Sequence, residues 1–199
     1  MKTKFKIFLC VVIVILVTTV WCVRYVSLNS YYASVSNNSR AVYQLGEIVS
    51  FGEDYINKDM SIPGYSIKVN RFEIQQFDEY TKALGINQDD IYSKPEKLAL
   101  VHITLFNDNS VAEGVMLSEF KLHGVDNYVG LDWDILTAVN PVLQGSYGIS
   151  LSPGTQYDIT LPFDLYAEHF GADTWKSINE YQLFLHITAY PMEKDIKVQ

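Results

Sequence analysis

Alternating apolar and polar positions recur along the chain and predict β-strands. Between Tyr157 and Leu165 every second residue is apolar, and a period of two places these side chains on one face of a half-buried strand. Pro162 lies within this run and cannot donate a ladder hydrogen bond, so we expect an edge strand or an irregularity there. The same alternation predicts two further core strands: Ala99, Val101, Ile103 and Leu105, and Leu183, Leu185, Ile187 and Ala189.

The apolar phase shifts once, within residues 66–75. Ile67 and Val69 occupy odd positions, whereas Phe72 and Ile74 occupy even positions. One extra residue at positions 70–71 would return both pairs to one face, so the pattern predicts a β-bulge. Shorter strands are expected at 47–51, 116–122 and 147–151, and helical periodicity is limited to 77–84 and 172–178.

These short strands, with turns rich in Gly, Pro and Asn, predict an all-β domain over residues 41–199. An antiparallel β-sandwich is the first expectation, and a barrel is the alternative. Residues 27–40 are rich in Ser and Asn and have no apolar period, which is typical of a flexible tether. About 160 residues remain for the domain, enough for one full core.

An uncharged apolar run from Ile7 to Val23 precedes the tether. As a helix it would span about 25 Å, the short end of what crosses a bilayer. The bulky residues that follow are poor cleavage sites, so we predict an uncleaved transmembrane signal anchor at 7–26, with cleavage and secretion or a buried helix as alternatives. Three lysines precede the run, so the tail at 1–6 is expected in the cytoplasm and the C-terminal domain outside the cell.

Charge and cysteine content narrow the partners and the compartment. From Tyr25 onward the chain holds 11 basic and 23 acidic residues, a net charge of −12. Such a domain should repel nucleic acid and anionic lipid head groups. Cys10 and Cys22 both fall within the apolar run, so the domain cannot form a disulfide, which is more typical of a Gram-positive bacterial surface than of a eukaryotic secretory route.

Several strand-and-turn motifs resemble a known family across residues 46–188. The chain is similar to the telokin-like, immunoglobulin-fold extracellular domains of unknown function that follow a signal anchor in Gram-positive bacteria. The resemblance implies an immunoglobulin-like antiparallel β-sandwich of seven or more strands on the cell surface, with no catalytic residues to carry over. The insertion at 77–97 is longer than expected for such domains. The motifs are Leu45-Gly46-Glu47, the run from Leu100 to Asn107, and Leu151-Ser152-Pro153-Gly154-Thr155 leading into Ile159–Asp164.

Catalytic and metal-binding motifs do not stand out. The four histidines form no short ligand pair, so we expect no metal site and no cofactor. His102 and His186 are interpreted as ordinary strand residues, although two histidines can meet across strands and bind a metal. A serine nucleophile elbow is missing, since Gly145–Gly148 is interpreted as a turn. Paired carboxylates are common by chance in so acidic a chain, and a carboxylate hydrolase therefore stays open.

The segment 126–134 has the most suggestive composition. It combines carboxylates, an amide and two large aromatic residues, and we take Tyr128, Asp132, Trp133 and Asp134 as candidate ligand-binding residues. Trp133 could stack on a sugar ring while the aspartates accept hydroxyl hydrogen bonds, or the oxygens could hold Ca²⁺, although the spacing does not match an EF-hand. The structural alternative is a strand with Trp133 inward and both aspartates outward.

We therefore expect a single-pass cell-membrane protein whose extracellular domain is a non-catalytic binding or assembly module. The membrane would be contacted through residues 7–26, and the partner would be an envelope protein or a wall glycan. A membrane-tethered hydrolase that acts on cell-wall polymers with paired carboxylates is the main alternative, and a purely structural spacer or subunit is another.

Overall fold

The computed structural model describes residues 5, 8, 12, 14–26, 39–60, 62–108, 114–125, 127–143 and 145–199. The chain divides into two units, Met1–Asn38 and Ser39–Gln199. Residues 14–26 are helical. Among the described residues, no helix has both the length and the apolar character needed to cross a membrane. Residues 7, 9–11 and 13 of the predicted anchor, the cytoplasmic tail apart from residue 5, and residues 27–38 of the tether lie outside the described residues.

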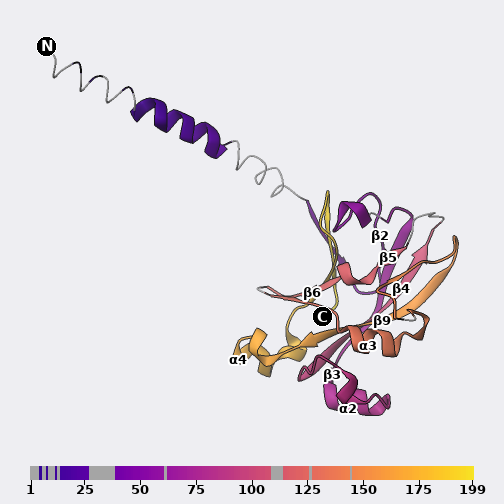
Figure 1. The fold of residues 1–199 in the computed structure, drawn as a ribbon. Helices are drawn as coiled ribbons and strands as arrows, with labels where there is room; N and C mark the ends of the chain where they lie inside the picture. The colour runs from indigo at the N-terminus through magenta and orange to yellow at the C-terminus, as the bar shows by residue number, and fades with distance from the viewer. Residues whose placement is uncertain are drawn as a thin grey trace. The chain divides into compact units, whose positions relative to one another are not determined.

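The second unit is built mainly of two β-sheets, as expected for an all-β sandwich (Figure 1). The first sheet has the strand order β1-β11-β10-β6-β7, and β1 runs parallel to β11 while the other pairs are antiparallel. Its strands are β1 (Arg40–Gln44), β6 (Lys121–His123), β7 (Tyr128–Val129), β10 (Phe184–Thr188) and β11 (Glu193–Lys197). Since Arg40 pairs with Glu193, the domain begins at least one residue earlier than the predicted residue 41.

The second sheet is antiparallel throughout, with the strand order β2-β3-β4-β9. Its strands are β2 (Ile48–Ser50), β3 (Tyr65–Gln76), β4 (Lys97–Asn107) and β9 (Gln156–Leu165). The β3–β4 register shifts between Val69 and Arg71, which confirms the predicted bulge. The strand β9 that carries Pro162 lies at the sheet edge, as its proline predicts.

Short elements complete the domain. The predicted strand at 116–122 is wrong as a single element, because a 3-10 turn divides it into β5 and β6. The helices are α2 (Phe77–Ala83), α3 (Trp133–Val139) and α4 (Ala172–Lys176). The small remaining sheet pairs β5 (Val115–Met116) with β8 (Gly148–Ile149). The 3-10 turns are Lys58–Met60, Gln88–Asp90, Leu117–Glu119, Pro141–Leu143, Ala167–His169 and Ile178–Glu180.

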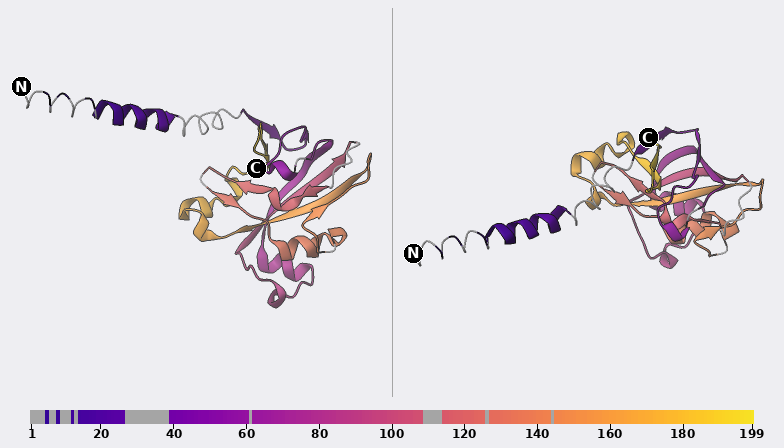
Figure 2. Two further views of the ribbon diagram at one scale, coloured as in Figure 1. Left: turned by 45° about the horizontal axis from the view of Figure 1, so that its top comes forward. Right: turned by 90° about the horizontal axis from the view of Figure 1, so that it is seen from above.

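The main core draws on residues of both large sheets, including Val101 and Ile103 of β4 and Leu185 of β10. The first half of β4 is buried on its other face too, because Leu98 and Leu100 pack with Phe77 and Ile135 in a second apolar cluster. Figure 2 shows α2 and α3 on the same side of the long strands of the second sheet. This cover explains why alternation alone underestimates the burial of β4.

Candidate functional site

Residues 127–134 form no continuous strand, and the candidate residues of this segment separate into two places. Tyr128 lies on β7, the edge strand of the first sheet, and Leu131 forms a bridge with Phe163 of β9. Asp132 then caps α3, because its Oδ1 accepts a hydrogen bond from Ile135 N at 2.9 Å. The strand interpretation of Trp133 is therefore wrong, since a well-capped helix begins there.

The first place is a surface of aromatic and carboxylate side chains beside the start of α3. The rings of Trp133 and Tyr147 meet edge to face at 4.6 Å. Asp134 Oδ2 accepts a hydrogen bond from the backbone nitrogen of Tyr92 at 2.8 Å, which ties the preceding loop to the helix. Tyr92 is 99% exposed and Tyr147 is 52% exposed. We call Tyr92, Trp133, Asp134 and Tyr147 the aromatic surface.

Asp132, unlike Asp134, is buried, and it forms a carboxyl pair with Asp164 of β9. Burial raises the pKa of Asp132 to about 7, and the neighbouring Asp164 adds to the rise. The pKa of Asp164 is also raised by burial, although the hydroxyl of Ser93, 2.5 Å from its Oδ2, opposes the rise. Asp132 Oδ2 and Asp164 Oδ1 are buried without an ordinary donor. A single proton shared by the two carboxyl groups satisfies both atoms.

This pair is poorly suited to hydrolysis of a glycoside. The two carboxyl groups of glycoside hydrolases stand about 5–9.5 Å apart on either side of the bond they cleave. Asp132 and Asp164 instead hydrogen-bond to each other, and Asp132 is only 2% exposed. Asp132 also holds the helix start with its other oxygen. The arrangement is that of a structural carboxyl pair that joins α3 to β9.

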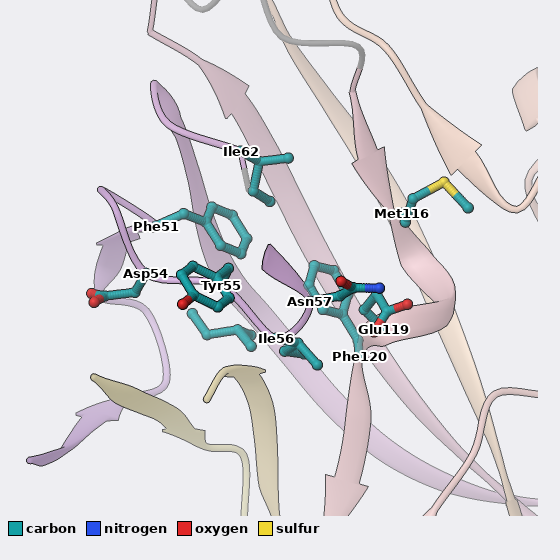
Figure 3. A pocket seen from close by; sticks show the side chains of 10 residues that line it. Phe51, Asp54, Tyr55, Ile56, Asn57, Ile62, Met116, Glu119 and Phe120 are labelled. Carbon is teal, nitrogen blue, oxygen red and sulfur yellow. The ribbon is translucent and has the colours of Figure 1, made fainter. Parts of the chain in front are cut away.

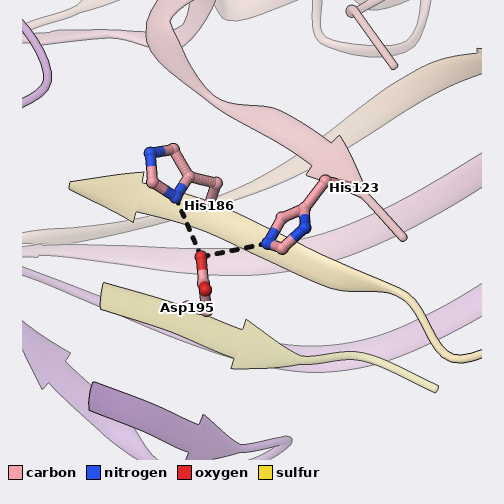
Figure 4. Close-up of side chains that lie close together, drawn as sticks. All are labelled: His123, His186 and Asp195. Carbon is pink, nitrogen blue, oxygen red and sulfur yellow. Dashed lines mark hydrogen bonds and ion pairs between the residues drawn. The ribbon is translucent and has the colours of Figure 1, made fainter. Parts of the chain in front are cut away.

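The second place is a cluster of ionisable side chains on the first sheet, formed by His123, His186 and Asp195 (Figure 4). Sheet register brings them together, since His186 pairs directly with Asp195, and His123 pairs with Phe184 two residues away on the same face. The alternate residues Leu122, Leu185 and Ile196 belong to the main core. The cluster therefore lies on the face of the sheet that is turned away from this core.

Asp195 is fully buried at the centre of this cluster. Its Oδ1 lies 2.9 Å from His186 Nδ1 and 3.2 Å from His123 Nε2, and its Oδ2 accepts a hydrogen bond from Arg40 Nε at 2.7 Å. Burial would raise the pKa of Asp195, but the hydrogen-bonding His123 and His186 hold it well below the usual range. The buried carboxylate is thus ionised and compensated by its neighbours.

His123 is oriented by its backbone neighbour. Its Nδ1 lies 2.9 Å from the carbonyl oxygen of Gly124, and a carbonyl accepts only, so Nδ1 carries a hydrogen. Burial would lower the pKa of His123, but the Asp195 carboxylate and this carbonyl raise it overall. Tyr128, 66% exposed, stacks on the ring of His123 at 5.1 Å and meets His186 edge to face at 6.2 Å.

His102 confirms the interpretation as an ordinary strand residue, whereas His186 does not. His102 lies on β4 and contacts Glu73 and Thr160 across the two neighbouring strands. His186 instead meets Asp195, which lies nine residues further along the chain, and His123, which is distant in the sequence. The alternation pattern placed His186 correctly in a strand, but it gave no signal for strand order. Only the order β11-β10-β6 reveals the cluster.

An apolar cavity near Phe51, Tyr55 and Phe120 is too small for an organic ligand (Figure 3). Its volume is about 20 Å³, which admits little more than a water molecule. Phe51 and Phe120 are both 1% exposed and stack on each other at 6.1 Å. The cavity is a packing gap between core residues and the loop at residues 54–57.

Comparison with known proteins assigns the chain to a family whose function is unknown. No curated protein and no solved structure gives a significant match to the chain. Residues 40–194 match a family model described as a domain of unknown function, DUF5028, and this match extends from the first residue of β1 into β11. The chain therefore belongs to the DUF5028 family.

Proposed function

We propose that this protein is a membrane-anchored, extracytoplasmic binding module that attaches to a wall glycan through the aromatic surface. The observation that carries this proposal is the exposure of Tyr92 and Tyr147 beside Trp133 and Asp134. Aromatic rings offer rigid, amphipathic contact area, and a carboxylate can accept hydrogen bonds from sugar hydroxyls.

The geometry of this surface suits an extended polymer more than a small ligand. Trp133 is partly buried against the main core, so its ring is held in place by packing. The Asp134 side chain is fixed by the Tyr92 backbone, which also positions the loop before β4. An exposed, pre-ordered surface loses little conformational entropy when a ligand binds.

The placement outside the cell membrane rests on the charge asymmetry around the apolar run and on the sandwich. An immunoglobulin-like fold is supported by the strand order, in which β1 lies parallel beside β11 and β4 pairs with β9 across the second sheet. The net charge of −12 after residue 24 suits a neutral polysaccharide or a cationic partner better than an anionic one.

The test is sedimentation of the purified full chain, solubilised in detergent, with insoluble bacterial cell walls. The double variant Tyr92→Ala/Tyr147→Ala should lower the affinity at least about tenfold, since each ring face buries apolar area worth about 1.4 kcal/mol or more. The matched control is Tyr157→Ala, whose ring is 41% exposed on β9. Equal binding by the double variant and the wild type would contradict the proposal.

The carboxylate hydrolase is kept as a second candidate because the structure does bring two carboxyl groups together. The same incubation tests it, since a hydrolase releases soluble sugar fragments with time. Release that is abolished by Asp164→Asn but retained by Tyr157→Ala would favour the hydrolase. We expect no release from any variant, because the carboxyl pair is buried and already engaged.

A further inference from the structure

The cluster on the first sheet contains a candidate metal-ligand atom. Because Nδ1 of His123 donates to the Gly124 carbonyl, Nε2 is the ring atom that can bind a metal ion once its own hydrogen is released. Nε2 is buried, its near partner is Asp195 Oδ1 at 3.2 Å, and the side chain is only 8% exposed. Nε2 points at Asp195 Oδ1, as Figure 4 shows. A divalent cation can take the place of the hydrogen between these two atoms, because metal binding to histidine releases the proton from the ligand nitrogen.

We propose that His123, His186 and Asp195 bind one Zn²⁺ ion on the outer face of the first sheet. Neither the wall-glycan function nor the family assignment implies this site, which lies on different strands from the aromatic surface. The three ligand atoms all lie within 4.8 Å of one another. Among the described residues, these three form the one group of three His, Cys, Asp or Glu side chains whose ligand atoms lie close enough to hold a metal ion.

The distances fit a tetrahedral ion. Zinc lies about 2.0–2.1 Å from nitrogen and carboxylate oxygen ligands, so neighbouring ligand atoms stand about 3.3 Å apart. The separations from Asp195 Oδ1 are 3.2 Å to His123 Nε2 and 2.9 Å to His186 Nδ1. A small outward rotation of His186 completes the triangle. The His186 hydrogen then moves to Nε2, because Nδ1 becomes the ligand.

The residues around the three ligands provide the hydrogen bonds that usually orient zinc ligands. Metal-bound histidine donates its other ring N–H to a carbonyl or carboxylate, and Gly124 provides this acceptor for His123. Arg40 holds the remaining oxygen of Asp195 at 2.7 Å and fixes the carboxylate plane. Glu193, 3.4 Å from Arg40 Nε, offsets the positive charge of that guanidinium. The positive charge of Arg40 is thus shared between Glu193 and Asp195, which leaves negative charge at Asp195 for the ion.

The ligand set selects the class of ion. Two imidazoles with one carboxylate suit zinc and the other divalent ions of the late first transition row, whereas Ca²⁺ and Mg²⁺ require oxygen ligands. Three protein ligands leave a fourth position open. Tyr128 lies over both histidine rings from the edge strand β7 and covers this side of the site. A water molecule can complete the coordination there.

The experiment is calorimetric titration of ZnCl₂ into the chelator-treated full chain in detergent, with a thermal melt of each sample. We expect one ion per chain, a higher Tm with zinc, and little response to MgCl₂ or CaCl₂. Replacing either ligand in His123→Ala or His186→Ala should weaken zinc binding more than the roughly 10–100-fold typical of losing a second-layer partner.

His102→Ala is the matched control, because His102 also lies between a carboxylate and an arginine, with Glu73 and Arg71 both 3.0 Å from its Nε2. This variant should bind zinc as the wild type does. X-ray absorption of the zinc-loaded wild type gives an independent readout if a ligand variant fails to fold. Two imidazoles in that spectrum support the site. No zinc uptake, unchanged affinity in both folded ligand variants, or a shell of oxygen ligands alone would overturn it.

Discussion

Two of the groups of ionisable side chains buried in the described part of the domain are neutralised in opposite ways. The carboxyl pair of Asp132 and Asp164 brings like charges together, so burial keeps a proton on the pair. The cluster of His123, His186 and Asp195 brings opposite charges together, so its carboxylate stays ionised. Arg40 completes the compensation of that carboxylate from the first strand of the domain.

This difference separates a structural contact from a candidate site. In the carboxyl pair, one shared proton provides a hydrogen bond between the two carboxyl groups. The pair joins the start of α3 to the edge strand β9. In the histidine cluster, His123 Nε2 and His186 Nδ1 converge on one oxygen of Asp195, at 3.2 Å and 2.9 Å, where an ion could replace the shared hydrogens. Only the second arrangement has a ligand atom to offer, although both contain the residue types that carry chemistry.

The largest effect is expected from Asp195→Asn, which removes the charge at the centre of the histidine cluster. Asp195 is fully buried, and its loss leaves Arg40 and His123 without their carboxylate. Breaking a buried ion pair on one side costs about 3–5 kcal/mol, so the free energy of unfolding should fall by that amount at pH 7. Urea denaturation measures it.

Asp173→Asn is the control for that measurement, because Asp173 is fully exposed and pairs only with Lys176 on the surface of α4. Its unfolding curve should overlay that of the wild type. A similar midpoint for Asp195→Asn and Asp173→Asn would mean that the histidine cluster does not stabilise the fold.

The next effect is a pH dependence that belongs to the carboxyl pair. An unfolded aspartate loses its proton near pH 4, whereas folded Asp132 loses it near pH 7. Between these values the folded state binds more protons, so stability falls as the pH rises. Each pKa unit corresponds to about 1.4 kcal/mol, and the total should be on the order of a few kcal/mol.

Asp132→Asn isolates this contribution. The amide can donate to Asp164 without a titrating proton, and its oxygen can still accept from Ile135 N. The variant should therefore lose most of the decline between pH 4 and pH 7 and should be more stable than the wild type at pH 8. If stability still declines between pH 4 and pH 7 in the variant, other groups cause the decline. The inference that Asp132 and Asp164 share a proton would then be wrong.

A smaller effect is expected from Arg40→Gln. The substitution removes a charged hydrogen bond to Asp195 and the contact of the guanidinium with the Phe184 ring at 5.3 Å. The Arg40 side chain is 44% exposed, so solvent screening holds the loss to about 1–2 kcal/mol. Urea denaturation at pH 7 checks it, and a loss as large as that of Asp195→Asn would show that the histidines contribute nothing.

Ser93→Ala should have the smallest effect. It removes a hydroxyl that contacts Asp164 and Tyr166, and one hydrogen bond contributes about 0.5–1.5 kcal/mol. The same change should raise the pKa of Asp164, because this hydroxyl opposes the rise caused by burial. A pH titration followed by NMR of the carboxyl carbons would reveal it, and an unchanged pKa would contradict the contact.

The strands and the bulge were predictable from the sequence, because apolar alternation is a local signal. The phase change between Val69 and Phe72 located the bulge, and Pro162 located an edge strand. The pattern failed at Trp133, where the Asp132 cap starts a helix that covers β4. Helix capping is also local, but the candidate chemistry of the aspartates obscured that signal.

The sites were predictable only in part, because they depend on strand order. Trp133 and Asp134 were identified from composition, and the structure adds Tyr92 and Tyr147 through long-range contacts. Tyr128 was grouped with them, yet it lies over the histidine cluster. That cluster joins β6, β10 and β11, and its residues have no short spacing in the sequence that could indicate a shared site.

We expect the histidine cluster, and not the carboxyl pair, to bind an ion. NMR of the histidine ring nitrogens in the full chain, before and after one equivalent of ZnCl₂, distinguishes the two. Zinc should shift His123 Nε2 and His186 Nδ1 into the range of metal-bound nitrogen, while His102 and His169 stay unchanged. Uniform small shifts at all four histidines, or none at His123, would contradict it.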